Sequence, residues 1–234
     1  MNVKPILFNT EMVRANLDGR KACTRRLVKF LPGENPQWTE YIKDGLMLYN
    51  GKNEPCIRKA PYQPGDILYV RETWQYLYEL DGNEQIIEGT GKYYYAATDT
   101  IPFDTYVDAS GVTHERVPWK PSIHMPKEAA RIWLKVTDVR VERLQEIDED
   151  GVWDEGFRFK PPCLTRVSAD GHTCDLDGPC TSSIKYCDMT MGELFGRELW
   201  NSTIKKSDLN RYGWDANPWV WIIEFERCEK PEGV

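Results

Sequence analysis

The stretch 131–141 places the strictest limit on the fold, because its apolar residues change sides part-way along. They first occupy alternate even positions and then alternate odd positions: Ile132, Leu134 and Val136, followed by Val139 and Val141. Side chains of a strand alternate between its two faces, so this switch of parity predicts a β-bulge or sharp bend near Thr137-Asp138. Strands of β-barrels often need a bend of this kind.

Short helices are predicted by residues that cap and end them. A side-chain oxygen just before a helix accepts a hydrogen bond from an N–H of its first turn, and glycine readily ends the last turn. In chain order, the predicted caps and ends are Thr10 with Gly19, Asp148 with Gly156, and the capping box of Thr190 with Glu193.

Further strands are predicted by apolar runs that follow turns. A turn at 64–66 precedes the apolar run 67–70, and a second strand is expected over 92–97. The last strand alternates over 219–225, and we interpret its tryptophans as core. The stretch 75–119 is rich in turn and polar residues, which predicts an elaborated hairpin or insertion.

Composition is that of a globular protein. Hydrophobic residues make up 41% of the 234 and charged residues 29%, and no run approaches the roughly 18 apolar residues of a membrane span. The first 21 residues resemble neither a secretory signal nor a transit peptide, so we expect a cytoplasmic protein with no membrane partner. Common phosphate-loop, dinucleotide, zinc-protease and serine-hydrolase motifs are missing from the sequence.

Charge limits the contacts with nucleic acid. With 30 basic and 37 acidic residues the net charge is −7, which argues against a wide surface that coats DNA non-specifically. One basic patch stands out in this acidic chain: Arg20, Lys21, Arg25, Arg26 and Lys29. The patch is either a local contact for a polyanion or a solvated charged turn.

The segment 18–26, DGRKACTRR, resembles the opening signature of ASCH-domain proteins, a branch of the PUA-like superfamily. Further landmarks follow in the family's order: Gly65-Asp66 with its strand, the central strand 136–146, the helix ending at 154–156, and the last strand 219–226. The segments 119–126 and 214–221 also look like the longer members carried by bacteriophages and prophages. The resemblance implies one α+β domain over 1–234, a PUA-like mixed β-barrel with short flanking helices and insertions at about 75–118 and 157–188.

In one bacterial branch of that family, a lysine, a threonine and a glutamate remove the acetyl group from N4-acetylcytidine. The matching positions are Lys21, Thr24 and Glu155, with Glu149 and Glu146 as alternatives to the last. Amide hydrolysis needs an activated nucleophile and a proton for the departing nitrogen. We expect Lys21, with a pKa lowered by burial or nearby positive charge, to be the base. Thr24 is expected to be the nucleophile or to hold the attacking water. Glu155, at a helix C-terminus, is expected to have a raised pKa and to donate the proton. The alternative is an ordinary ion pair beside a turn threonine.

A base also needs a flat surface to stack on and polar groups for its edge. The aromatic candidates are Trp74 and Trp119, and the polar candidates are Arg20, Arg25, Arg26, Arg71, Ser122 and His124. Each has a structural interpretation as well, since a tryptophan at a strand end is usually partial core and a histidine can cap a loop.

The second insertion concentrates thiols. Four of the seven cysteines lie there with a histidine, and a loop so poor in apolar residues needs a fastening such as tetrahedral zinc. The candidate ligands are Cys163, Cys174, Cys180 and Cys187, with His172 as an alternative. The other interpretation is a set of free thiols. No cofactor is expected to take part in the reaction.

Three functions therefore remain open. The first is an amidohydrolase acting on N4-acylated cytidine or a related modified nucleoside. The second is a module that binds RNA or a modified base without chemistry. The third is a phage morphogenesis or host-interaction protein that keeps only the barrel. The sequence determines neither the oligomeric state nor the choice among RNA, DNA and free nucleoside.

Overall fold

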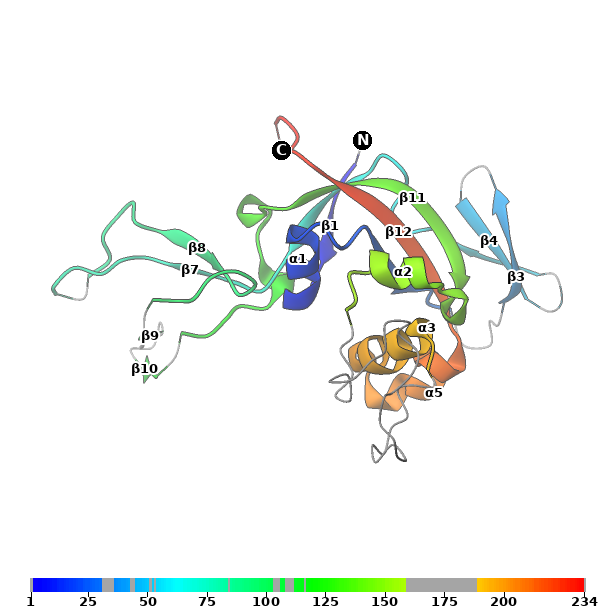
Figure 1. Cartoon of the computed structure of the whole chain (residues 1–234). Helices are drawn as coiled ribbons and strands as arrows, with labels where there is room; N and C mark the ends of the chain where they lie inside the picture. Colours follow the sequence, from blue (N-terminus) through cyan, green and yellow to red (C-terminus); the bar gives the residue numbers. More distant parts are fainter. Residues whose placement is uncertain are drawn as a thin grey trace, which may run out of the picture. The chain divides into compact units, whose positions relative to one another are not determined.

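The fold is α+β, with its strands in four sheets. The computed structural model describes residues 2–30, 36–42, 45–50, 52, 54–83, 85–102, 106–107, 112–115, 117–158 and 189–233. The largest sheet has five strands in the order β1-β6-β11-β12-β2, and the smaller sheets are β3-β4-β5, β7-β8 and β9-β10 (Figure 1). Among the described residues β1 and β2 are the edges of the large sheet, so the strand order shows no closed barrel.

The strands are β1 Val3–Leu7, β2 Cys23–Leu27, β3 Pro36–Ile42, β4 Gly45–Asn50, β5 Pro55–Arg58, β6 Ile67–Arg71, β7 Trp74–Leu77, β8 Lys92–Tyr95, β9 Tyr106–Val107, β10 Thr113–His114, β11 Trp133–Arg143 and β12 Trp219–Cys228. The α-helices are α1 Thr10–Leu17, α2 Glu149–Asp154, α3 Met191–Leu194, α4 Asn201–Thr203 and α5 Leu209–Tyr212. A π-helical stretch, η5 Phe195–Trp200, continues α3, and 3-10 turns include η1 Ser122–His124.

The chain divides into two compact units. Unit 1 comprises Met1–Gly19, Pro64–Thr137 and Phe225–Val234, and unit 2 comprises Arg20–Gln63 and Asp138–Glu224. The strands β11 and β12 each contribute residues to both units.

In unit 1, β6 pairs in parallel with β1 and antiparallel with β11. The predicted turn before β6 is present, with Gly65 at a φ of 87° that favours glycine. Asp66, which follows, is 3% exposed and binds Lys4 with an N–O distance of 2.7 Å. The buried apolar side chains of these strands and of Phe8, which follows β1, form a core that includes Ile6, Leu68, Val70 and Leu134.

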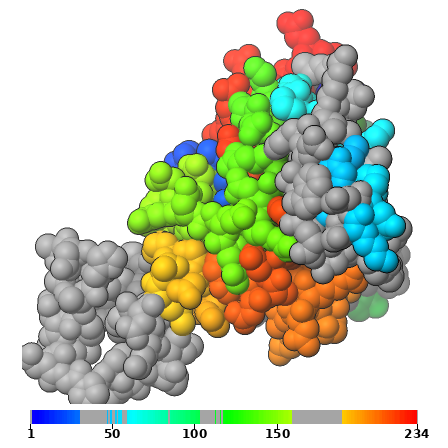
Figure 2. Space-filling view, turned by 90° about the vertical axis from the view of Figure 1, so that its right-hand side faces the viewer, coloured from blue at the N-terminus to red at the C-terminus, as the bar shows by residue number. Residues whose placement is uncertain are grey.

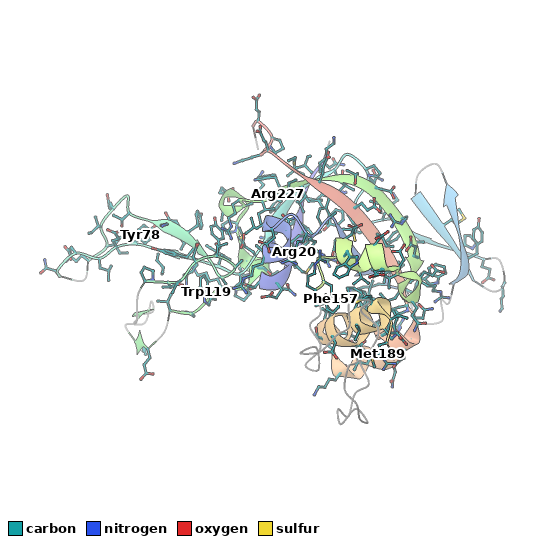
Figure 3. All side chains as sticks on the ribbon, viewed as in Figure 1. Arg20, Tyr78, Trp119, Phe157, Met189 and Arg227 are labelled. Carbon is teal, nitrogen blue, oxygen red and sulfur yellow. The ribbon has the colours of Figure 1, made fainter. Side chains whose placement is uncertain are left out.

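The predicted insertion near 75–118 contains a hairpin in which β7 pairs antiparallel with β8. Its aromatic side chains contact one another, with ring centroids of Tyr76 and Tyr93 4.6 Å apart and those of Trp74 and Tyr93 5.8 Å apart. Tyr78 extends beyond the end of β7 and is 41% exposed (Figure 3).

In unit 2, β12 pairs antiparallel with β2, and the helices pack on a shared apolar cluster. In the space-filling view, the yellow and orange surface of the helical segment adjoins the green surface of α2 and the residues before it (Figure 2). The buried members of the cluster are Cys23, Leu144, Ile147, Val152, Phe195, Trp200, Trp214, Val220 and Ile222.

Most local predictions are confirmed. Asp148 caps α2 by accepting from the N–H of Gly151, and Gly156 follows α2 with a φ of 77°. Thr190 and Glu193 form the predicted capping box of α3. The predicted cap of the first helix was wrong by one residue. Asn9, not Thr10, accepts from the N–H of Met12, because Thr10 already has helical geometry.

The parity switch in β11 is also present. Leu134 and Val136 are at most 1% exposed, whereas farther along the buried residue is Val141. The strand itself is continuous across Thr137-Asp138. In β12, Trp219 and Trp221 are buried as predicted, and the intervening Val220 is buried as well, so both faces of this strand are covered.

Candidate functional site

Lys21 and Glu155 meet where the chain enters β2 and leaves α2. The two residues form an isolated antiparallel bridge, and the N–H of Ala22 donates to the carbonyl of Asp154 at 2.8 Å. The ammonium of Lys21 lies 2.5 Å from Oε2 of Glu155 and donates to the backbone carbonyl of Glu155 at 3.0 Å. Lys21 is 4% exposed and Glu155 7%, so this ion pair is buried.

The second carboxylate oxygen of Glu155 is bound by Arg25. Oε1 accepts from the backbone N–H of Arg25 at 2.6 Å, and one guanidinium nitrogen lies 3.5 Å away. The same nitrogen donates to the carbonyl of Gly151 at 3.3 Å. Arg25 of β2 therefore contacts both a residue of α2 and its C-cap residue, Glu155. Because β2 is an edge strand, its outward N–H groups are available to a side-chain acceptor in this way.

The raised pKa expected for the carboxyl of Glu155 was wrong. Burial alone would raise the pKa of this carboxyl, as would the helix C-terminus. The charges of Lys21 and then Arg25 outweigh burial, and the pKa of Glu155 lies below its usual value of 4.5. Glu155 is therefore an anion at neutral pH and is not a resting proton donor.

Thr24 lies one residue before Arg25, on the other face of β2. Successive side chains of a strand point to opposite faces, so Thr24 and Arg26 share one face of β2. In the pairing of β2 with β12, Thr24 is the partner of Ile223 and Arg26 is the partner of Trp221. Thr24 is fully buried, and its hydroxyl has no hydrogen-bond partner among the described residues. The described contacts thus bring Lys21 and Glu155 together but do not join the threonine hydroxyl to them.

The two alternative glutamates, Glu146 and Glu149, occupy other positions. Glu146 accepts from the backbone N–H of Arg143 at 2.8 Å. Glu149 lies in the first turn of α2, whereas Glu155 is its C-cap residue. In the described part of the chain, Glu155 is the one of the three candidates that forms an ion pair with Lys21.

The remaining basic residues of the signature have separate contacts. Arg20 donates to the carbonyl of Gly156 at 2.8 Å, beside Phe157 (Figure 3). Arg26 donates to the carbonyl of Arg25 and lines a cavity of about 590 Å³ in unit 2. This cavity was not predicted, because its walls come from segments far apart in the sequence. The lining residues are Arg25, Arg26, Leu27, Val28, Lys29, Lys59, Pro61, Tyr62, Trp200, Thr203, Ile204 and Trp221.

Five predicted base contacts belong to unit 1. Arg71 donates to the carbonyl of Met125 at 2.6 Å. Trp74 is 7% exposed, with Lys120 5.0 Å from its ring centroid, so it is largely core. Trp119 is half-buried, and the turn η1 contains Ser122, half-buried, and His124, exposed.

The predicted zinc ligands Cys163, His172, Cys174, Cys180 and Cys187 lie outside the described residues, so that site stays a prediction. Within the described part of the chain, no group of three metal-ligating side chains gathers. Cys23 is a buried free thiol there, and burial, followed by the charge of Glu155, raises its pKa to about 12. It therefore stays protonated at neutral pH and is a poor nucleophile.

Comparison with known proteins adds no family. Neither the family models, nor the curated proteins, nor the solved structures contain a match to this chain. Within the described residues, no helix has the length and apolar character needed to cross a bilayer.

Proposed function

We propose that this chain is an ASCH-type, PUA-like amidohydrolase that removes the acyl group from N4-acylated cytidine or a related modified nucleoside. The supporting observation is the buried pair of Lys21 and Glu155, 2.5 Å apart, together with the buried Thr24 of β2, whose hydroxyl has no hydrogen-bond partner among the described residues. A buried carboxylate with a shifted pKa and a buried hydroxyl without a partner are each more frequent at functional sites than elsewhere.

The direction of each proposed proton transfer follows from the ionised state of Glu155. Glu155 is ionised, so it accepts the proton of the attacking hydroxyl, either that of Thr24 or that of a water held by it. The ammonium of Lys21 then donates a proton to the departing N4 nitrogen, so that the amine leaves neutral. These roles are the reverse of those expected from the sequence. The reason is that Lys21 and Arg25 stabilise the anion more than burial destabilises it.

A substrate would reach Lys21 and Glu155 by way of Arg25, which lines a cavity beside β2. All three side chains are buried, but Arg25 both binds Glu155 and lines the cavity beside β2. The substrate would approach from that side, where Thr24 and Arg26 share one face of the strand.

The test is incubation of the purified chain with N4-acetylcytidine while cytidine is measured by chromatography. We expect cytidine from the wild type and a loss of about 100-fold or more in Glu155→Gln and Lys21→Met. Lys206→Ala is the matched control, because Lys206 is exposed and lies outside the cavity. No turnover by a folded wild-type protein that still binds RNA would contradict the hydrolase and favour a binding module that performs no chemistry.

A further inference from the structure

The outer end of the β7–β8 hairpin exposes a group of apolar side chains. Tyr78 is 41% exposed, Leu80 53%, Ile86 59% and Ile87 40%. In the described part of the chain, these are four of the seven large apolar side chains that are exposed. Exposed apolar groups that gather in one place mark interaction surfaces, so residues 78–88, here called the hairpin tip, are a candidate interface.

The backbone of the hairpin tip is held in place by its own hydrogen bonds. Oδ1 of Asp81 accepts from the backbone N–H of Asn83 at 2.8 Å and from that of Gln85 at 2.9 Å. Leu80 and Ile86 face each other in a β-bridge. Because the tip is already ordered, binding to a partner does not have to order it, which lowers the free-energy cost of association.

A second exposed apolar residue of unit 1, Ile123, lies in a basic segment. Residues 120–127, here called the basic turn, precede Glu128 and contain no acidic residue. Their basic members are Lys120, His124 and Lys127. Ile123 is 57% exposed, whereas Met125 is fully buried and its carbonyl accepts from Arg71 at 2.6 Å. The basic turn is therefore anchored through Met125 and presents Ile123 outward.

The hairpin tip and the basic turn have opposite charges. The tip contains four acidic residues and no basic one. An acidic surface repels nucleic acid and anionic membranes, and it also repels a second acidic tip. It attracts an apolar surface with a basic rim, and the basic turn has this character because Ile123 is flanked by basic side chains.

The hairpin tip lies too far from the basic turn of its own chain to contact it. Lys120 forms an antiparallel β-bridge with Trp74, the first residue of β7, so the chain after Lys120 runs away from the tip. A strand rises about 3.3 Å per residue, which places Leu80 about 20 Å beyond Trp74 along the hairpin (Figure 1). A contact between the two patches therefore requires a second copy of the chain.

We propose that two copies of this chain form a two-fold symmetric dimer in which the hairpin tip of each packs on the basic turn of the other. Such an interface is self-complementary, because the same contact is made twice. The two patches together comprise about 20 residues of each copy, near the roughly 20 to 30 per side of a standard interface. The dimer is independent of the proposed hydrolysis, since Lys21 and Glu155 belong to unit 2 and both patches belong to unit 1.

The test is sedimentation equilibrium of the full chain at pH 7, from about 1 to about 200 µM. We expect a monomer–dimer equilibrium that weakens about threefold or more between about 0.05 and 0.5 M NaCl, because salt screens the attraction between the two patches. The double variant Leu80→Ser with Ile86→Ser should raise the dissociation constant at least tenfold, and so should Ile123→Ser. All three side chains are exposed, so these variants should fold. Leu7→Ser, which changes an exposed apolar side chain outside both patches, is the matched control and should leave the constant unchanged.

Mixing the variants distinguishes a contact between tip and turn from a contact between two tips. A dimer of one Leu80→Ser chain and one Ile123→Ser chain keeps one contact in which both patches are intact, whereas each variant alone keeps none. The mixture should therefore associate at least threefold more tightly than either variant alone.

Three results would overturn the proposal. A wild-type chain that stays monomeric at about 200 µM would mean that the hairpin tip binds a different protein. A dimer that is unaffected by the tip variants and by Ile123→Ser would place the interface elsewhere. A mixture that associates no more tightly than the two separate variants would exclude the contact between tip and turn. Turnover of N4-acetylcytidine, measured on the same variants, should not change, so a failure of the dimer and a failure of the hydrolase are read separately.

Discussion

Replacing Thr24 with valine should stabilise the protein and abolish turnover at the same time. Valine keeps the shape of threonine and removes only the hydroxyl, which is fully buried and has no partner among the described residues. Burying a hydroxyl without a hydrogen bond costs about 1 to 3 kcal/mol. We therefore expect the free energy of unfolding of Thr24→Val to rise by about 1 to 2 kcal/mol. For a chain of this size that corresponds to a melting temperature roughly 2 to 8 °C higher.

The assay is urea unfolding of both proteins at pH 7, combined with the N4-acetylcytidine reaction. Thr190→Val is the matched control, because it makes the same chemical change at a hydroxyl that is used. Thr190 accepts from the N–H of Glu193 at 3.2 Å as the cap of α3, and its loss should lower the free energy of unfolding by about 1 kcal/mol.

Two results would refute the reasoning about Thr24. A free energy of unfolding lowered by 1 kcal/mol or more would mean that the hydroxyl is hydrogen-bonded in the free protein. Stabilisation with full turnover would mean that the hydroxyl is unsatisfied for a reason other than catalysis. Stabilisation with lost turnover is the combination expected of a group retained for function at the expense of stability.

The remaining predictions concern Glu155, Cys23 and the second insertion. The pKa of Glu155 is lowered from 4.5, so its stabilising contribution is complete above about pH 4.5 and is lost as pH falls through the lower folded pKa. The difference in free energy of unfolding between the wild type and Glu155→Gln should accordingly shrink in acid, and a difference that is constant from pH 7 to pH 3 would contradict this. Because the pKa of Cys23 is raised to about 12, its thiol should resist iodoacetamide at pH 8 in the folded protein and react in urea, as read by peptide mass mapping. Equal labelling rates in the two conditions would exclude the protected thiol. The predicted site of Cys163, Cys174, Cys180 and Cys187 should give about one zinc per chain by elemental analysis, and well under one would remove the zinc.

Local features of the fold were predictable because they depend on neighbours in the sequence. The capping residues Asp148 and Thr190 each accept a hydrogen bond from a backbone N–H three residues later. Gly65 and Gly156 allow a turn because they adopt a positive φ. The one error of this kind, at Asn9 and Thr10, is a shift by one residue between two side chains that can both cap. Closure of the strands into a PUA-like barrel depends instead on pairing between segments far apart in the sequence. The strand order of the described residues shows no such closure, so the barrel remains a proposal.

The sequence by itself determined which residue types stand at the signature and at the ends of short helices and strands. Only the tertiary structure decided that Lys21 meets Glu155, 134 residues away, and that Arg25 adds a second positive charge. The sign of the pKa shift of Glu155 follows from that geometry, since electrostatic energy depends on the distances between charges and on burial, neither of which is written in residue order. The basic cavity arose in the same way, because its cations and rings come from four separate segments that only the packed chain brings around one space.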